Sequence, residues 1–483
     1  MSFLDEYTKK MIGLDTVFDS LKLLSPYGRT LKKSIIPYKD EAKLKAELDS
    51  IETILCLIKS KAQVFFEIEK ALGKVCDIKS SINRCLAGDT LDDIELYEIK
   101  CFSILSEHIR GNYIKLNAML KELYSKDISD VVRLLDADGK GFETFHIYDE
   151  YSVKLEEIRI TKINIEKELY GTKDIDLIAT LKAKRLKLVH AEQKEELKVE
   201  QELSKKLIAR SSDISNNMDF IGRIDLLIAK ARLAEDENLS KPEISEILQM
   251  KNGINPVAKA FLEEKGLKFT PITMELSKGV TLITGANMGG KTISLGIVAL
   301  NTYLAQMGFY VYAESFLFPF MDFVYYVSED MSSFSDGLST FGGEVLKVKE
   351  IIKETKKFKG LILIDEFARG TNPEEGSNLI KALIKYLNNT SSISLLTTHF
   401  DKVILCNIRH YQVRGLKDAN LKDLEEKLSD KNYSAIEAIQ SKMDYTLDEV
   451  TGITEVPKDA LNICRMLGLD AQIINYAEEY YKK

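Results

Sequence analysis

The distribution of apolar residues divides the chain into a helical part and a part in which strands alternate with helices. No proline lies between Pro37 and Pro242, and Leu, Ile, Lys and Glu are abundant there. Because proline breaks helix interiors, so long a stretch without it predicts long helices. Two are expected between Tyr151 and Arg210, with a break near Tyr170-Gly171-Thr172. Another shows the three-to-four spacing of one buried face, at Leu48, Ile51, Ile54, Leu55 and Ile58.

No alternating strand pattern is expected before about Pro256, and short β-rich runs then alternate with helices. Strands separated by helices are typical of an α/β domain with a mainly parallel sheet. We therefore expect a multidomain protein, with an all-α helical domain over residues 1–245, an α/β domain over 246–458 and a C-terminal helical tail over 459–483. The expected strands are Val280–Thr284, Phe309–Tyr312, Phe323–Ser328, Leu361–Ile364 and Ser394–Thr397.

Composition narrows the class of protein. Hydrophobic residues make up 45% and charged residues 29%, and no run of 18 apolar residues predicts a membrane span. The first residues lack the basic-then-apolar order of a signal peptide, and the six cysteines form no C-x-x-C pair. These features favour a cytoplasmic protein with reduced cysteines. The net charge of −8 argues against nucleic-acid binding by the whole surface, but it leaves room for a local basic face.

A phosphate-binding loop is the most specific motif in the chain. The residues Gly285, Ala286, Asn287, Met288, Gly289, Gly290, Lys291 and Thr292 fit the pattern G-x-x-x-x-G-K-[ST]. The loop follows an expected strand and precedes an apolar helix, so its backbone N–H groups and the helix N-terminus would face phosphates. In such a loop Lys291 reaches the β- and γ-phosphates, and the Thr292 hydroxyl holds Mg²⁺. The motif predicts ATP and Mg²⁺ as cofactors.

Two later strands end in residues that complete a nucleotide hydrolysis site. Gly360–Ile364 is an apolar run followed directly by Asp365 and Glu366. Asp365 would hold the Mg²⁺ shell, and Glu366 would polarise the attacking water. The run Leu395–Thr398 ends at His399, which would contact the γ-phosphate or the attacking water. We therefore expect Lys291, Glu366 and His399 to be catalytic, with Thr292 and Asp365 at the metal.

These motifs, taken in order, resemble the ATPase domain of the MutS family, an ABC-type ATPase. The family's loop reads G-P-N-M-G-G-K-S where this chain has Gly285–Thr292, and its acidic motif D-E-x-x-x-G-T corresponds to Asp365–Thr371. Gly337–Phe341 resembles the family's G-x-S-T-F signature, with Glu344 at the position of a downstream family Glu. The likeness is closer over Phe269–Phe400 than over the residues before it.

The resemblance implies a P-loop ATPase that works as a pair. In ABC-type enzymes the signature of one subunit completes the nucleotide site of the other, so Ser339 would act in trans and the chain would form a homodimer. Phe269 falls where the family places an aromatic ring against the adenine, although an ordinary core position explains it equally well. The long helices would form the family's core and lever. The mismatch-reading, clamp and nuclease domains of longer relatives are expected to be missing.

Two functions remain open at this stage. The first is a DNA-acting ATPase of the mismatch-repair type, which would use the basic cluster Lys182–Lys187 on one lever helix. The second is a protein-remodelling ATPase with no nucleic acid involved. Some short MutS-like ATPases are associated with cobalamin-dependent aminomutases, such as those of the lysine 5,6 type, and are thought to act as reactivases. The acidic total charge suits the second function, and no motif names the partner.

Overall fold

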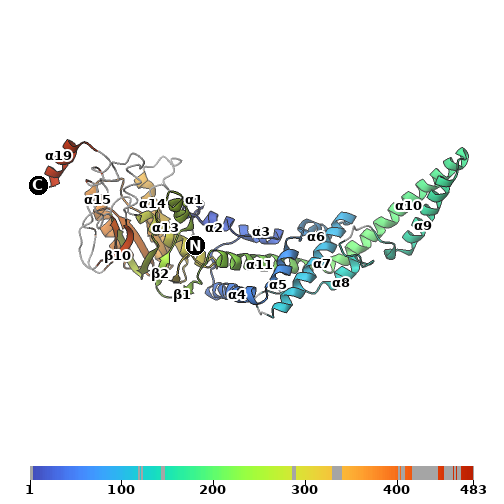
Figure 1. Cartoon of the computed structure of the whole chain (residues 1–483), viewed down its shortest axis with the longest axis horizontal. Coiled ribbons are helices and arrows are strands. Elements are labelled where there is room, and N and C mark those ends of the chain that lie inside the picture. Colours follow the sequence, from blue (N-terminus) through green and yellow to red (C-terminus); the bar gives the residue numbers. More distant parts are fainter. Residues whose placement is uncertain are drawn as a thin grey trace. The chain divides into compact units, whose positions relative to one another are not determined.

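The computed structural model describes residues 4–117, 120, 123–142, 147–285, 290–328, 340–400, 403, 408–415, 444–450, 461, 464 and 469–481. Its internal contacts divide the chain into two compact units, whose elements are labelled in Figure 1. The helical unit comprises Lys22–Ile35 and Ser50–Ala231, and the sheet unit comprises Met1–Leu21, Ile36–Asp49 and Arg232–Lys483. Three segments expected in the helical domain, residues 1–21, 36–49 and 232–245, therefore group with the sheets.

The helical unit consists of helices joined by short connections. Within the described ranges it contains α3 (Pro26–Lys33), α5 (Ala62–Leu72), α6 (Lys79–Leu86), α7 (Asp93–Leu116), α8 (Ser129–Leu135), η1 (Asp149–Tyr151), α9 (Val153–Gly171) and α10 (Ile175–Ile208). The division between the units falls within α4 (Glu41–Ser60) and α11 (Ser211–Asp236). Four of the five residues of the predicted apolar face of α4 are buried, namely Leu48, Ile51, Ile54 and Ile58, and Leu55 is partly buried.

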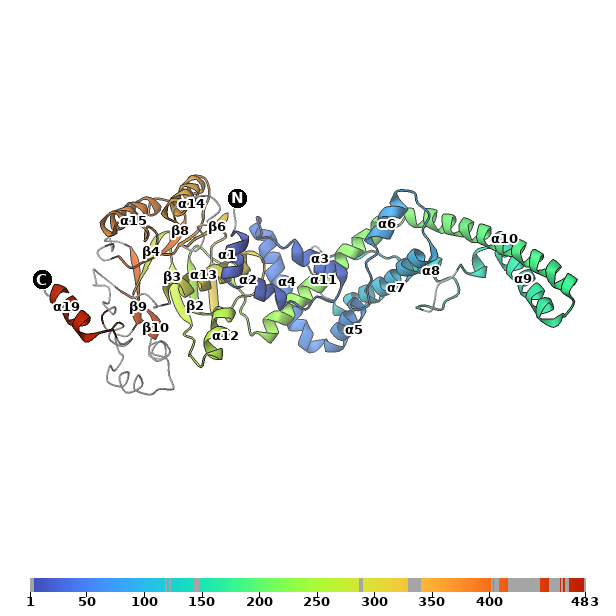
Figure 2. The ribbon, with the colours of Figure 1, turned by 90° about the horizontal axis from the view of Figure 1, so that it is seen from above.

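Helices α9 and α10 form the antiparallel pair that the sequence predicts, with the break at the expected place (Figure 2). The Asp174 side chain caps α10 by accepting from the backbone N–H groups of Asp176 and Leu177. Across the pair, the Arg159 guanidinium contacts the carboxylates of Glu192 and Glu196. Ionic contacts and buried apolar residues such as Leu155 and Leu181 therefore both stabilise the helix pair.

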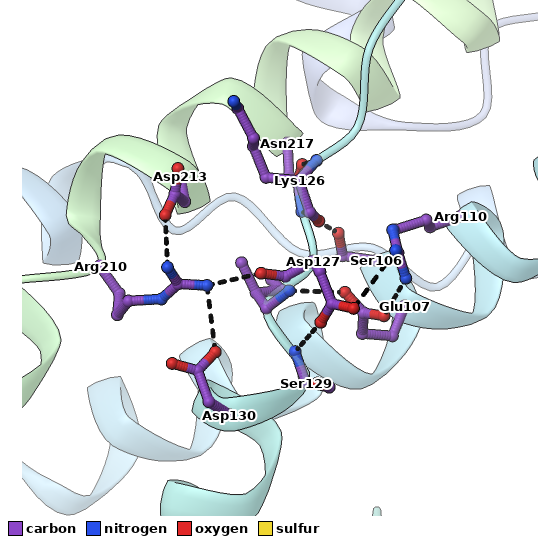
Figure 3. Close-up of polar contacts among 11 residues, drawn as sticks. Ser106, Glu107, Arg110, Lys126, Asp127, Ser129, Asp130, Arg210, Asp213 and Asn217 are labelled. Atoms are coloured by element: carbon purple, nitrogen blue, oxygen red, sulfur yellow. Dashed lines mark hydrogen bonds and ion pairs between the residues drawn. The ribbon is translucent and has the colours of Figure 1, made fainter.

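A polar network joins the end of α10 and the start of α11 to α7 and α8 (Figure 3). The side chain of Asn217 is fully buried. Its amide nitrogen donates to the Ser106 hydroxyl at 3.0 Å and to the Lys126 carbonyl at 2.9 Å, and its oxygen accepts from the Lys126 N–H at 2.7 Å. Arg210 lies between Asp130 and Asp213. Because buried polar groups are costly when unpaired, this network fixes how the four helices meet.

The described residues of the sheet unit form two sheets. One has the order β1-β5-β2-β3, built from β1 (Glu243–Ile244), β2 (Leu248–Gly253), β3 (Ile272–Leu276) and β5 (Ser315–Phe318). The six-stranded sheet has the order β10-β9-β4-β8-β7-β6, built from β4 (Gly279–Thr284), β6 (Phe323–Val327), β7 (Gly360–Ile364), β8 (Ile393–Thr398), β9 (Arg409–Gly415) and β10 (Asp444–Glu449). In the larger sheet only β10 pairs antiparallel, so it is mainly parallel as expected.

Helices cover the larger sheet on both faces. Figure 2 shows α14 (Thr340–Thr355) and α15 (Pro373–Leu387) on one side and α13 (Lys291–Gln306) on the other. Apolar residues of α14 and α15 join those of β4, β7 and β8 in one buried cluster. The unit also contains α1 (Glu6–Met11), α2 (Leu14–Asp19), α12 (Pro256–Glu264) and α19 (Ala471–Tyr481). Two layers of helix around a parallel sheet leave its carboxyl edge open for a site.

Two strand predictions are wrong. Strands β1 and β2 precede Pro256, where no strand was expected, and Phe309–Tyr312 is not a strand. That run is a buried apolar segment whose N–H groups find other acceptors. The Phe309 N–H donates to the Leu304 carbonyl, and the Tyr312 N–H donates to the Asn301 side chain at 2.7 Å. A buried apolar run of this length does not by itself distinguish a strand from a packed loop.

Candidate nucleotide hydrolysis site

Three neighbouring parallel strands deliver the predicted residues to one edge of the sheet. Strands β4 and β8 pair with Thr284 opposite Thr398, and β7 and β8 pair with Ile364 opposite Leu396. The residues after these strands therefore emerge side by side, at the carboxyl edge where ligands bind in open α/β sheets. This register brings together Gly285, the Asp365–Glu366 pair and His399.

Lys291 begins α13 and is almost fully buried, with 4% of its side chain exposed. Its ammonium group donates to the Gly285 carbonyl at 2.8 Å and lies 3.0 Å from Glu366 Oε1. The preceding residue, Gly290, has a φ of 78°, and no side chain among the described residues caps the helix. Gly290 has no side chain that could cap the helix, and the N–H groups at a helix N-terminus suit an anion.

The two predicted metal ligands meet directly. The Thr292 hydroxyl donates to Asp365 Oδ2 at 2.6 Å, and Asp365 Oδ1 accepts from the Thr397 hydroxyl at 2.6 Å. Burial raises the pKa of Asp365 above its ordinary value, and the two hydroxyl groups act in the opposite direction. A hydroxyl oxygen and a carboxylate are ligands that Mg²⁺ prefers, and Mg²⁺ takes most of its remaining ligands from water and phosphate. The residues present thus fit a Mg²⁺–nucleotide complex.

Glu366 is surrounded by nitrogen-bearing side chains. Besides Lys291, its carboxylate lies 3.3 Å from the Arg369 guanidinium and 3.6 Å from Nδ1 of His399. The His399 ring and the Lys291 ammonium lower the pKa of Glu366 to about 2, against the effect of burial. The His399 nitrogen is beyond ordinary hydrogen-bond distance, so we assign it the weaker contact and Lys291 the stronger one. Glu366 therefore carries a negative charge at neutral pH.

The turn that carries Glu366 is held in an unusual backbone conformation. Glu366 has a φ of 48° and Ala368 a φ of 63°, values in the left-handed region that residues other than glycine seldom adopt. The Glu366 N–H donates to the Thr397 hydroxyl at 3.0 Å, and the Ala368 N–H donates to Glu344 at 2.9 Å. Strain of this kind persists only where the surroundings enforce it, and it concentrates at functional sites.

Two glycines of the phosphate loop allow close backbone approach. Gly285 has a φ of 148°, and a Cβ atom there would lie 3.0 Å from Cβ of Val413. At Gly290 a Cβ atom would lie 2.9 Å from the Tyr445 ring. Both positions combine a backbone angle that favours glycine with a neighbour that would have to shift to admit a side chain. The loop glycines that are described are therefore required by the fold of this edge.

Comparison with known families agrees with this geometry. Residues 281–480 match the family model described as MutS domain V.

The matched part of the chain, residues 281–480, is similar to MutS domain V.

Curated relatives support the assignment. "Endonuclease MutS2" of Thermus thermophilus is 32% identical over 44% of this chain and 28% of its own length. "Endonuclease MutS2" of Fusobacterium nucleatum is 31% identical over 59% of this chain and 35% of its own length. "DNA mismatch repair protein MutS" of Clostridium kluyveri is 27% identical over 83% of this chain and 53% of its own length. The match thus spans about half or less of each MutS relative.

The MutS-type site brings together most of the residues predicted for it. Lys291, Thr292, Asp365, Glu366 and His399 converge as described above. The remaining loop residues and the signature serine lie outside the described residues: Ala286, Asn287, Met288, Gly289 and Ser339. Phe269 precedes β3 and is 9% exposed. Burial is expected both for a ring that contacts the adenine and for an ordinary core phenylalanine, so contact with the adenine stays a prediction.

Sequence reasoning assigned no role to Thr397 or Arg369. Thr397 lies two residues before His399 in a strand rich in leucine. A hydroxyl group in such an apolar strand was the feature that could have identified Thr397 as a site residue. A polar side chain in a buried strand is costly unless it is hydrogen-bonded. Arg369 lies three residues after Glu366 in the acidic motif, a spacing that places the two side chains close together within the turn. No helix in the described part of the chain is long and apolar enough to span a membrane.

Proposed function

We propose that the chain is a MutS-like ATPase that binds and hydrolyses ATP with Mg²⁺ at the carboxyl edge of its six-stranded sheet. The observation that carries the proposal is the direct contact between Thr292 and Asp365 beside the Lys291–Glu366 ion pair. Nucleotide hydrolysis needs a phosphate cradle, metal ligands and a group that positions water. These residues supply the three requirements from three separate segments of the chain.

Each residue has a part that its contacts suggest. The start of α13 and the Lys291 ammonium bind the phosphates, and Thr292 and Asp365 hold the metal. Bound Mg²⁺ would neutralise charge on the phosphates. Glu366, with its pKa lowered to about 2, accepts a hydrogen bond from the attacking water and orients it more than it removes a proton outright. His399 lies on the other side of the Glu366 carboxylate, within reach of the same water.

The ion pair between Lys291 and Glu366 links nucleotide binding to water activation. Two of the three donors of the Lys291 ammonium face Glu366 Oε1, 3.0 Å away, and the Gly285 carbonyl, 2.8 Å away, so phosphate oxygens compete with these contacts for Lys291. When Lys291 turns to the phosphates, the Glu366 carboxylate loses a cation and becomes free to accept from water. We infer that the site exchanges one charge pair for another on binding.

The functional unit is a homodimer in this proposal, with the Ser339 signature of one chain completing the site of the other. This arrangement rests on the likeness to ABC-type ATPases stated for Gly337–Phe341. The paired helical units would act as levers whose movement follows the nucleotide. DNA is the proposed ligand of the levers, supported by the name of the Clostridium kluyveri relative and by the exposed side chains of Lys182, Lys184 and Lys187 on α10.

Phosphate release by the purified chain tests the proposal. Wild type should release phosphate from ATP only when Mg²⁺ is present, and Lys291→Ala should lose at least about 100-fold in turnover, as expected when charge stabilisation of the transition state is removed. Undiminished turnover in Lys291→Ala would reject the site. Duplex DNA should raise the rate of the wild type, with a steep dependence on salt. If an aminomutase raises the rate of phosphate release and DNA does not, the ligand of the helical units is a protein and not DNA.

A further inference from the structure

A single hydroxyl group contacts both acids of the site. Thr397 is the second-last residue of β8, and only 2% of its surface is exposed. Its Oγ1 donates to Asp365 Oδ1 at 2.6 Å and accepts from the Glu366 N–H at 3.0 Å. A hydroxyl group has one donor and two acceptor positions, so both bonds form at once.

The bond to Asp365 sets the direction of its carboxylate. One oxygen, Oδ1, is held by Thr397, and the other, Oδ2, meets the Thr292 hydroxyl at 2.6 Å. With Oδ1 fixed, rotation of the carboxylate is blocked and Oδ2 stays aimed at Thr292. The pair of proposed metal ligands is therefore assembled before a metal arrives, which reduces the cost of organising the site.

The bond to Glu366 holds the strained turn. Glu366 has a φ of 48°, a left-handed conformation that residues other than glycine adopt only at an energetic cost. The Thr397 hydroxyl accepts the N–H of this residue, which gives the backbone a partner in that conformation only. Release of this bond would let the turn relax and would move the Glu366 carboxylate away from Lys291.

The neighbours of Thr397 argue against a purely packing role. Strand β8 is buried along its whole length, and Leu395 and Leu396 precede Thr397. Valine has nearly the shape of threonine and would serve packing there without a polar atom to satisfy. A buried hydroxyl contributes only when its hydrogen bonds are made, and here both partners are site residues.

We propose that Thr397 is a positioning residue that sets the metal-binding carboxylate of Asp365 and the water-orienting carboxylate of Glu366 through one hydroxyl group. The proposal rests on the ATP hydrolysis proposed above. Thr397 acts through the two acids and touches neither nucleotide nor metal. Its removal should therefore change the response to Mg²⁺ and the chemical step, while leaving the contacts that bind the nucleotide in place.

The test compares Thr397→Val, Thr397→Ser and Thr397→Ala with wild type in the full chain. Thr397→Val should lower kcat about 10- to 100-fold and raise the Mg²⁺ concentration for half-maximal rate about 10-fold, the usual range for loss of a group that orients a metal ligand. KM for ATP at saturating Mg²⁺ should change less than about threefold, because kcat reports interactions made in the transition state. Thr397→Ser keeps the hydroxyl and should stay within about threefold of wild type in kcat.

Ser394→Ala is the matched control, since Ser394 is a buried hydroxyl on the same strand whose oxygen has no hydrogen-bond partner among the described residues. It should behave as wild type. Thermal unfolding checks that each variant is folded. If Thr397→Val does not fold, the difference in kcat and in Mg²⁺ dependence between Thr397→Ala and Thr397→Ser tests the role of the hydroxyl group. Equal losses in the serine and valine variants, or wild-type values in valine, would overturn the positioning role alone. Absence of Mg²⁺-dependent hydrolysis by wild type would overturn the proposed function as well.

Discussion

Glu344 and Ala368 are joined by a hydrogen bond in which the Ala368 N–H donates to Glu344 Oε2 at 2.9 Å. The bond ties α14 to the turn that carries Glu366. Both residues are buried, at 5% and 0% exposure, and Ala368 has a φ of 63°. Helix α14 begins directly after Ser339, so it is adjacent in sequence to the signature. Through Glu344 the same helix contacts the acidic turn. We therefore expect a shift of α14 to move the turn that carries Glu366.

Substitution of Glu344 tests this link. Glu344→Ala leaves the buried Ala368 N–H without its acceptor, which should lower the free energy of unfolding by about 1–3 kcal/mol and reduce ATP turnover. Glu344→Gln keeps an oxygen that can accept the bond and should lie closer to wild type in both properties. Urea unfolding and phosphate release measure the two effects. Equal losses in both variants would show that the acceptor at Ala368 is not what matters.

The elements of this chain were predictable where a local pattern decides them. The break between α9 and α10 follows from Gly171 and from the Asp174 cap, and the order of β4, α13, β7 and β8 follows from the motifs. The prediction of a strand at Phe309–Tyr312 is wrong because the residues are apolar as a result of their burial, and burial does not require a strand. The Phe309 N–H is satisfied by the end of α13, the Val311 N–H by the Ser240 carbonyl and the Tyr312 N–H by Asn301. The contact with Ser240 is too distant in sequence for a short window to contain it.

The site was predictable in its charged residues and not in the groups that hold them. Lys291, Asp365 and Glu366 stand in motifs of fixed spacing. Thr397 lies 31 residues from Glu366, and Glu344 lies 24 residues from Ala368, so both bonds depend on the register of the sheet and the packing of α14. The left-handed conformation of Glu366 has no sequence signal, since glycine is the residue that normally marks it.

Asn217 anchors the junction of the helical unit, and its loss should destabilise that unit. Asn217→Ala removes three hydrogen bonds and leaves the Lys126 N–H and carbonyl without their partner (Figure 3), which should cost about 2–3 kcal/mol of unfolding free energy. Asn164→Ala, at an exposed position on α9, is the control and should change stability by less than about 0.5 kcal/mol. Chemical denaturation of both variants measures the difference. A cost at Asn217 no larger than at Asn164 would contradict this account.

The low pKa of Glu366 makes a prediction about acid stability. Its value of about 2 in the folded chain lies below the ordinary 4.5, so the ionised carboxylate stabilises the fold fully above about pH 4.5. That contribution is lost as pH falls from about 4.5 towards 2. The advantage of wild type over Glu366→Gln in urea unfolding should therefore be constant from pH 7 to 5 and shrink from pH 4.5 to 3. A difference that stays constant down to pH 3 would exclude the charge contacts of Glu366.

Self-association should depend on the nucleotide. If the signature of one chain completes the site of its partner, ATP binding joins the two sheet units and stabilises the dimer. Sedimentation velocity of Glu366→Gln, which should retain ATP, is expected to show more dimer with ATP and Mg²⁺ than without. Wild-type enzyme that stays monomeric at full activity, with and without ATP, would refute completion of the site in trans.

The separation of ATP binding from ATP hydrolysis at Glu366 tests the central claim most directly. Lys291 and the start of α13 are assigned to the phosphates, Thr292 and Asp365 to the metal, and Glu366, with His399 beside it, to the orientation of the attacking water. In a single-turnover experiment, Glu366→Gln should bind radiolabelled ATP with Mg²⁺ about as tightly as wild type and cleave it at least about 100-fold more slowly. Cleavage at the wild-type rate by the folded variant would contradict the account.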